Sequence, residues 1–236
     1  FISILLFNSQ VYAEHWGKPK INGNGPWNQN LIISVTDSKN NILLNNGDIL
    51  VKQAGVANLI IINNKPRLYF QWLPTSKDLY KNFDHIAFVD FENGWSDPRI
   101  ISIPFKDKPH KYPVDPTVVK LEDGSFRLYF TTVKKGRAHI SSAKSKDGIN
   151  FSLEKGKRFG DKKLNLKDSA VVFYNGLWHI ITPSHKQNGQ GYYGVSTDGI
   201  VFERKEDVKI NVKGDWLGNF SIVDGRVFFY GTGFIA

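Results

Sequence analysis

Two aspartates stand just before short β-branched runs, and they are the residues of this chain best placed to do chemistry. Asp115 opens the run Asp-Pro-Thr-Val-Val, and Asp168 opens the run Asp-Ser-Ala-Val-Val, 53 positions later. Two carboxyl groups that lie close together can divide acid and base roles, because repulsion between their charges raises the pKa of one of them. An aspartate before a strand can also act only as a turn cap, and the residues alone leave both interpretations open.

The segment that follows Asp115 predicts four short strands. Residues 117–119 lead to the turn at Asp123-Gly124, where glycine accepts the positive φ of a tight hairpin, and residues 127–131 form the expected returning strand. A third strand is expected at 138–143, and a Ser-Lys-Asp-Gly turn separates it from a fourth. Short antiparallel strands joined by such turns make one sheet.

This four-strand pattern recurs along the chain. The copy that begins at Asp168 ends in a Ser-Thr-Asp-Gly turn at 196–199, another copy begins at Asp215, and a more divergent copy runs from 57 to 103. A period near fifty residues with four strands per repeat is typical of a β-propeller, in which each repeat is one blade. We therefore expect an all-β chain with about four visible blades, four antiparallel strands in each blade, and almost no helix.

The composition suits one large β domain and argues against several functions. The 236 residues are 41% hydrophobic and 14% aromatic, and the net charge is +9. The lysines are scattered without an aromatic–basic motif, so we expect no nucleic-acid partner; lysines in solvated turns of an exported protein explain the charge, with an anionic glycan partner as the alternative. There is no cysteine, and the six histidines lack metal-ligand spacing. The sequence thus indicates no metal and no cofactor, and it leaves a structural Ca²⁺ open.

Residues 1–13 form an apolar run that ends in Val-Tyr-Ala. The run is too short for a membrane span and its end is similar to a cleavage site, so we interpret it as a partial signal peptide that packs poorly; the alternative is a buried N-terminal strand. Residues 14–236 are expected to form a single propeller domain that is truncated at its C-terminus, with 227–230 as an unpartnered edge strand. We expect a secreted or periplasmic monomer.

One repeat unit resembles the five-bladed propeller superfamily of glycoside hydrolase families 43 and 32 and their relatives. The unit reads D-P-T-V-V-x-L-x-D-G-x-x-R-L-Y-F-T and continues as A-K-S-K-D-G-I-N-F, and the likeness covers about residues 54–230. In the turn S-x-D-G-x-x-F, serine and aspartate are expected to cap the hairpin backbone while the aromatic residue fills the gap between blades. The six-bladed sialidases have a related turn with one more residue, so this class ranks behind.

The resemblance implies a site at one mouth of the central channel, where the innermost strands begin. Asp115 and Asp168 match the channel aspartates of the family, in which one acts as general base and another orients it, and they are the candidate catalytic residues. Asp215 matches loosely, because its distance to the next turn differs. The candidate substrate-binding residues at this mouth are Trp72, His110, Tyr112, Arg137, His185, Asp215 and Trp216.

For other residues a purely structural role is an alternative to the functional one. Trp72 and Trp216 suit packing between blades as well as a sugar platform, and His179 is expected to be a satisfied core histidine. The residues expected on the opposite face of the propeller, away from the site, are Glu122, Asp123, Asp147 and Asp198.

The chain also departs from the pattern of the family. No glutamate stands at the start of a visible innermost strand, where the family has its general acid, and Val56-Ala57-Asn58 occupies the place of an acid in the first full blade. Glycoside hydrolysis needs one protonated and one ionised carboxyl group. Three functions therefore stay open: a glycoside hydrolase acting on plant or algal glycan, a non-catalytic carbohydrate-binding propeller, and a sialidase-like exo-glycosidase. The last needs clustered arginines, and only Arg137 is expected near the mouth.

Overall fold

The structure is a computed structural model that describes residues 2–5, 30–37, 42–43, 48–73, 85–104, 113–134, 137–160, 163–184, 190–209, 216–223 and 225–232. All regular elements in these ranges are β-strands. The all-β fold expected from the repeats is therefore confirmed. In the same ranges, no helix is long and apolar enough to cross a membrane.

The strands form five sheets that follow one another along the chain. The first sheet contains β1 (Ile2–Leu5), β2 (Asn30–Asp37), β3 (Ile42–Leu43) and β4 (Asp48–Lys52). Blade I contains β5 (Ala54–Ile62), β6 (Lys65–Trp72), β7 (His85–Asp90) and β8 (Arg99–Ile100). Blade II contains β9 (Val114–Lys120), β10 (Phe126–Lys134), β11 (Arg137–Ser145) and β12 (Ser152–Leu153).

The chain continues into two further sheets. Blade III contains β13 (Ala170–Tyr174), β14 (Leu177–Pro183), β15 (Gln190–Ser196), β16 (Glu203–Arg204) and the short β17 (Val208–Lys209), which also pairs with β15. The last sheet contains β18 (Trp216–Val223) and β19 (Arg226–Thr232). Neighbouring strands within each sheet are antiparallel, as expected for the blades of a propeller.

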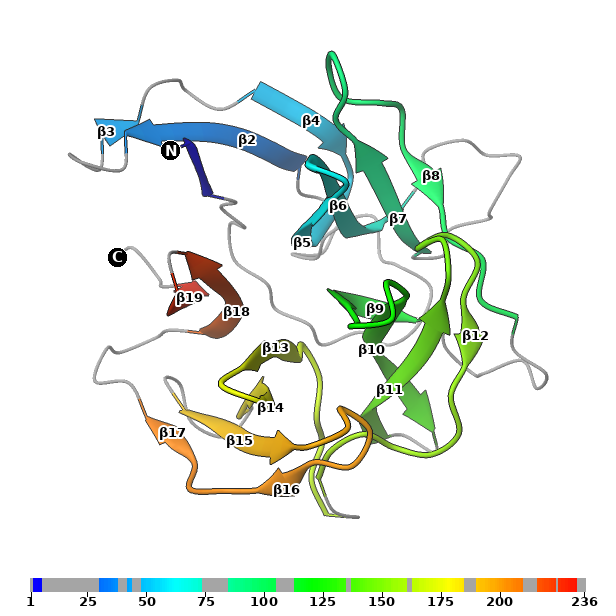
Figure 1. Cartoon of the computed structure of the whole chain (residues 1–236), viewed down its shortest axis with the longest axis vertical. Coiled ribbons are helices and arrows are strands. Elements are labelled where there is room, and N and C mark those ends of the chain that lie inside the picture. Colours follow the sequence, from blue (N-terminus) through cyan, green and yellow to red (C-terminus); the bar gives the residue numbers. More distant parts are fainter. Residues whose placement is uncertain are drawn as a thin grey trace.

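The sheets stand radially around a common centre (Figure 1). The innermost strands are β5, β9, β13 and β18, and each of them contacts the next one along the chain. Because β5, β9 and β13 each begin a four-stranded succession, their first residues lie at the same face of the propeller. The propeller architecture expected from the repeats is confirmed.

Apolar clusters between the sheets form the core. Tyr69 and Phe88 of blade I pack with Phe126 and Phe130 of blade II, and all four are at most 4% exposed. Phe151, from the turn before β12, completes this cluster. Phe202 has the same place in the cluster between blades II and III, beside Tyr129, Phe159 and Trp178. The expectation that the aromatic residue of each Ser-x-Asp-Gly turn fills the gap between blades is therefore confirmed.

An arginine and a tyrosine of blade I grip a turn of blade II. The Nη1 group of Arg67 donates to the carbonyl oxygen of Asp147 at 3.2 Å, and the hydroxyl of Tyr69 donates to the carbonyl oxygen of Gly148 at 2.7 Å. Asp90 holds the same arginine through two further hydrogen bonds, of 2.6 and 3.0 Å. We call this arrangement the Arg–Tyr clamp. Burial raises the pKa of Tyr69 to about 12, so the hydroxyl keeps its proton as donor.

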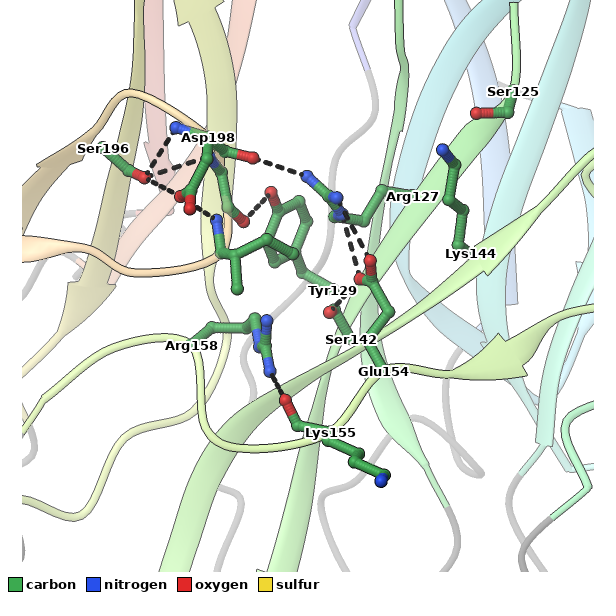
Figure 2. Close-up of polar contacts among 12 residues, drawn as sticks. Ser125, Arg127, Tyr129, Ser142, Lys144, Glu154, Lys155, Arg158, Ser196 and Asp198 are labelled. Carbon is green, nitrogen blue, oxygen red and sulfur yellow. Dashed lines mark hydrogen bonds and ion pairs between the residues drawn. The ribbon is translucent and has the colours of Figure 1, made fainter. Parts of the chain in front are cut away.

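The clamp is repeated between blades II and III (Figure 2). Arg127 donates to the carbonyl oxygen of Asp198 at 3.0 Å, and Tyr129 donates to the carbonyl oxygen of Gly199 at 2.7 Å. Glu154 accepts two hydrogen bonds from this arginine, of 2.9 and 3.1 Å. Each clamp thus joins an ion pair within one blade to the backbone of the next blade, which fixes the blades relative to each other.

Two predictions concern the ends of the chain, residues 1–13 and residues 227–230. Ile2–Leu5 forms β1, which pairs antiparallel with β2. The burial of these four residues is not described, so poor packing of residues 1–13 stays a prediction. The rest of this segment lies outside the described residues. Among the described residues β19 pairs with β18 alone, as expected for 227–230. The assignment of 1–13 as a signal peptide stays a prediction.

Candidate active site

Each of the three blades has a residue with left-handed backbone at the start of its innermost strand. The φ angles are 53° at Val56, 57° at Asp115 and 52° at Asp168. In β5 and β9 these residues lie in equivalent bulges, since the pairing skips from Gly55 to Asn58 in one and from Val114 to Thr117 in the other. Val56 and Asp115 are therefore structural equivalents, and Asp168, two residues before β13, shares their left-handed backbone. A bulge re-aims the side chain that it carries.

Two threonines of blade II connect Asp168 to the surroundings of Asp115. The hydroxyl of Thr131 accepts a hydrogen bond of 3.2 Å from the backbone N–H of Asp168, and Thr131 is the cross-strand partner of Val114, next to Asp115. The hydroxyl of Thr117, two residues after Asp115, donates to the carbonyl oxygen of Ser169. Both threonines are at most 3% exposed. The structure therefore brings the backbones of the two aspartates together at neighbouring strand starts.

Asn58 makes the corresponding connection between blades I and II. Its side-chain oxygen accepts a hydrogen bond of 2.8 Å from the backbone N–H of Val118. Asn58 stands two residues after Val56, as Thr117 stands two residues after Asp115. Hydrogen bonds thus connect the strand starts that carry the three left-handed residues, from blade I to blade II and from blade II to blade III. These cross-links have no signal in the sequence, because they join residues of different blades.

The surroundings of the two aspartates differ. Asp115 is 8% exposed, whereas Asp168 is half-buried. Two buried hydroxyls accompany Asp168, those of Ser169 and Thr182, and neither makes a hydrogen bond. The corresponding residues of blade II are Pro116 and Phe130, which are apolar. Blade III therefore has buried hydroxyl groups near the start of its innermost strand, where blade II has apolar side chains.

Three other candidate residues lie within the described ranges. Trp72 ends β6, opposite Ala54 near the start of β5, and its ring packs on the apolar cluster between the first sheet and blade I. Arg137 begins β11 and is exposed. Trp216 begins β18, where it pairs with Thr232. Their roles in binding stay predictions, and the remaining candidates lie outside the described residues: His110, Tyr112, His185 and Asp215.

The register of the last sheet bears on Asp215. Ala170 of β13 and Asn219 of β18 hold equivalent pairings when counted from the turns that end their strands. Leu217 therefore stands level with Asp168, and Asp215 precedes that level by two positions. The loose match of Asp215 in the sequence corresponds to this offset.

The aspartates expected on the opposite face act as turn caps. Oδ1 of Asp147 accepts hydrogen bonds of 2.8 Å from the backbone N–H groups of Ile149 and Asn150. Oδ1 of Asp198 accepts equivalent bonds of 2.7 and 3.0 Å from Ile200 and Val201. The N–H groups that each carboxylate accepts hold its pKa below the usual range. Both turns contact the beginnings of second strands through the Arg–Tyr clamps, at the end of the sheets away from Asp115. The expected capping role is confirmed.

His179 is hydrogen-bonded through both ring nitrogens. Nδ1 lies 2.7 Å from the hydroxyl of Tyr193, and Nε2 lies 3.1 Å from the carbonyl oxygen of Tyr174. The expectation of a satisfied histidine is confirmed, although the ring is only partly buried. Among the described residues, no group of three His, Asp or Glu side chains is arranged to hold a metal ion.

Similar structures have been solved for several glycosidases, while no protein-family model and no curated protein matches this chain. The α-L-arabinofuranosidase of Lactobacillus brevis matches with a TM-score of 0.64 at 12% identity, over 89% of this chain and 78% of the other. A GH43_1 enzyme of Xanthomonas citri, solved with xylotriose, matches with a TM-score of 0.63 at 12% identity, over 86% and 72%. A family 117 glycoside hydrolase of Zobellia galactanivorans matches with a TM-score of 0.61 at 11% identity, over 82% and 60%.

At these identities the likeness concerns the fold. The chain has the fold of the propeller glycosidases, as the repeat unit predicted. It spans 60% of the length of the family 117 enzyme and 78% of the length of the arabinofuranosidase.

Proposed function

We propose that this chain acts on a carbohydrate as a glycoside hydrolase-like propeller, with Asp115 and Asp168 as an acid–base pair at one mouth of the channel. The observation that carries the proposal is the equivalence of the two residues. Both occupy the left-handed position at the start of an innermost strand, and Thr117 and Thr131 tie these strand starts together. Equivalent positions on adjacent innermost strands direct their side chains toward the same mouth.

The chemistry of the pair follows from its environment. One carboxyl group has to donate a proton to the leaving oxygen while the other acts as base or nucleophile. Asp115 is the more buried of the two residues, with 8% of its surface exposed. Asp168 is half-buried, so this residue is more open to solvent than Asp115. The two carboxyl groups therefore have different surroundings, and together they can divide the acid and base roles.

The test is hydrolysis of a panel of aryl glycosides and plant polysaccharides by the full chain and by Asp115→Asn. We expect the substitution to lower turnover by a factor of about 10² or more while binding is retained. The matched control is Asp123→Asn, because Asp123 lies in the exposed β9–β10 turn at the other end of the sheet. Equal activity of wild type and Asp115→Asn would rule out the chemical role.

A binding function without catalysis is the second candidate, and a specific observation favours it. Val56 occupies the left-handed position of blade I, so this blade contributes no carboxyl group there. No described glutamate begins an innermost strand, and Glu154 is engaged by Arg127 in the clamp. Tight binding of a glycan from the panel, without turnover by the wild type, would select this function over hydrolysis.

A further inference from the structure

Val56 has a backbone conformation that its side chain disfavours. At positive φ a β-branched side chain is crowded by its own backbone, and such residues are outliers in proteins. Most of the other non-glycine residues with positive φ are Asn or Asp, which tolerate the left-handed region best: Asn63, Asn64, Asp115, Asp168 and Asn175. Val56 therefore has a backbone conformation that valine itself does not favour.

The surrounding sheet imposes this conformation on Val56. Gly55 pairs with Gln71 and Asn58 pairs with Tyr69, so the bulge is fixed on both sides by the ladder of blade I. The side chain of Asn58 is further held by the backbone of β9. The left-handed conformation is thus determined by the sheet and not by the type of residue at position 56. A side chain of any type at position 56 would be directed as Asp115 and Asp168 are directed in their blades.

We infer that Val56 is a specificity-determining residue of the channel mouth, where it forms an apolar wall beside the two aspartates. The inference rests on the proposed function. Val56 is half-buried, so part of its side chain is open to a ligand. A sugar ring has polar edges that bind carboxylates and C–H faces that pack on apolar side chains. Asp115 and Asp168 then take hydroxyl groups of the sugar, and Val56 takes a C–H face.

Three variants distinguish the proposed contact of Val56 with a ligand from the strain of its left-handed backbone. Val56→Thr keeps the β-branched shape and its strain but replaces an apolar methyl with a hydroxyl. Val56→Asn places in the bulge a residue that accepts positive φ. Asn175→Val creates the same strain in the exposed β13–β14 turn, at the opposite end of blade III, where φ is 49°. The readouts are thermal unfolding and calorimetric binding of xylotriose, cellotriose and arabinotriose.

The expected pattern differs for each variant. Val56→Thr should weaken binding of the best of these probes about tenfold at unchanged Tm, because only the apolar contact is lost. Val56→Asn should weaken binding similarly and raise Tm by about 2–4 °C. Asn175→Val should lower Tm by a similar amount and leave binding unchanged.

The outcomes distinguish this inference from the proposed function. If wild type binds a probe and both Val56 variants bind it equally well, Val56 does not contact the ligand, and the proposed function stands. If Val56→Asn does not raise Tm, the strain at this position is absent. If neither these probes nor the glycoside panel is bound or cleaved by the wild type, the proposed function fails and the ligand contact fails with it.

Discussion

A buried threonine hydroxyl stabilises this protein only where it finds a partner. Thr131 and Thr182 both lie on second strands and are both 0% exposed. Thr131 accepts the backbone N–H of Asp168, whereas the hydroxyl of Thr182 makes no hydrogen bond. Replacing a hydroxyl with a methyl group removes a hydrogen bond in the first case and a desolvation penalty in the second. The two residues therefore form a matched pair for testing what a buried threonine hydroxyl contributes to stability.

We predict opposite signs for the two isosteric substitutions. Thr182→Val should raise the free energy of unfolding by about 1 kcal/mol, because the buried polar atom without a partner is removed. Thr131→Val should lower it by about 1–3 kcal/mol, because the N–H of Asp168 is left unpaired. Urea denaturation monitored by tryptophan fluorescence measures both values. A loss of stability in Thr182→Val would show that its hydroxyl has a partner in solution.

Sheets that share an apolar interface can still slide, and the Arg–Tyr clamps oppose this. Each clamp contains directed hydrogen bonds from a second strand to the Ser-x-Asp-Gly turn of the following blade. The turn glycine is part of the clamp, since a Cβ at Gly199 would lie 2.8 Å from both Arg127 Nη1 and Tyr129 Oη. Gly176 has a similar φ, but a Cβ there meets nothing within 4 Å.

This difference predicts the effects of two alanine substitutions. Gly176→Ala should lower the free energy of unfolding by about 1 kcal/mol, through the left-handed backbone alone. Gly199→Ala should cost about 2–4 kcal/mol more, because the clamp hydrogen bonds are displaced as well. Thermal and urea unfolding of the two variants beside wild type measure the difference. Equal losses would mean that the clamp contributes nothing to stability.

Strands in the middle of the chain are paired on both sides, whereas the last described strand is paired on one side. In blade II, β10 pairs along its length with β9 on one side and with β11 on the other. In the last sheet, β19 pairs with β18 alone among the described strands. Backbone groups on an unpaired edge are open to water and exchange without unfolding of the sheet. We therefore expect the backbone of β10 to be better protected than that of β19.

Hydrogen exchange should report this gradient directly. We expect amides of residues 128–131 in β10 to be the slowest to exchange and amides of β19 to be among the fastest in any strand. Mass spectrometry of peptides after timed labelling resolves the two segments. Equally strong protection of β19 would indicate a further strand paired with it in solution.

Local signals in the sequence determined the blades of this protein. Turns such as Asp123-Gly124 and Asn175-Gly176 mark chain reversals through their own backbone preferences, and β-branched runs between them mark strands. The fifty-residue period then implied a propeller, and the equivalence of Asp115 with Asp168 followed from their places in the repeat. The repeated Arg-Leu-Tyr-Phe at 67–70 and 127–130 was also visible, and it is the signal from which the clamps were predictable.

The contacts that tie the strand starts together were decided only in three dimensions. Thr117, Thr131 and Asn58 tie the strand starts together through partners in other blades, and no local pattern encodes such pairs. The left-handed bulge at Val56 is also a tertiary effect, because valine disfavours the conformation that the ladder imposes on it. The pairing of β1 with β2 is likewise a tertiary contact, because residues 2–5 and 34–37 are far apart in the sequence.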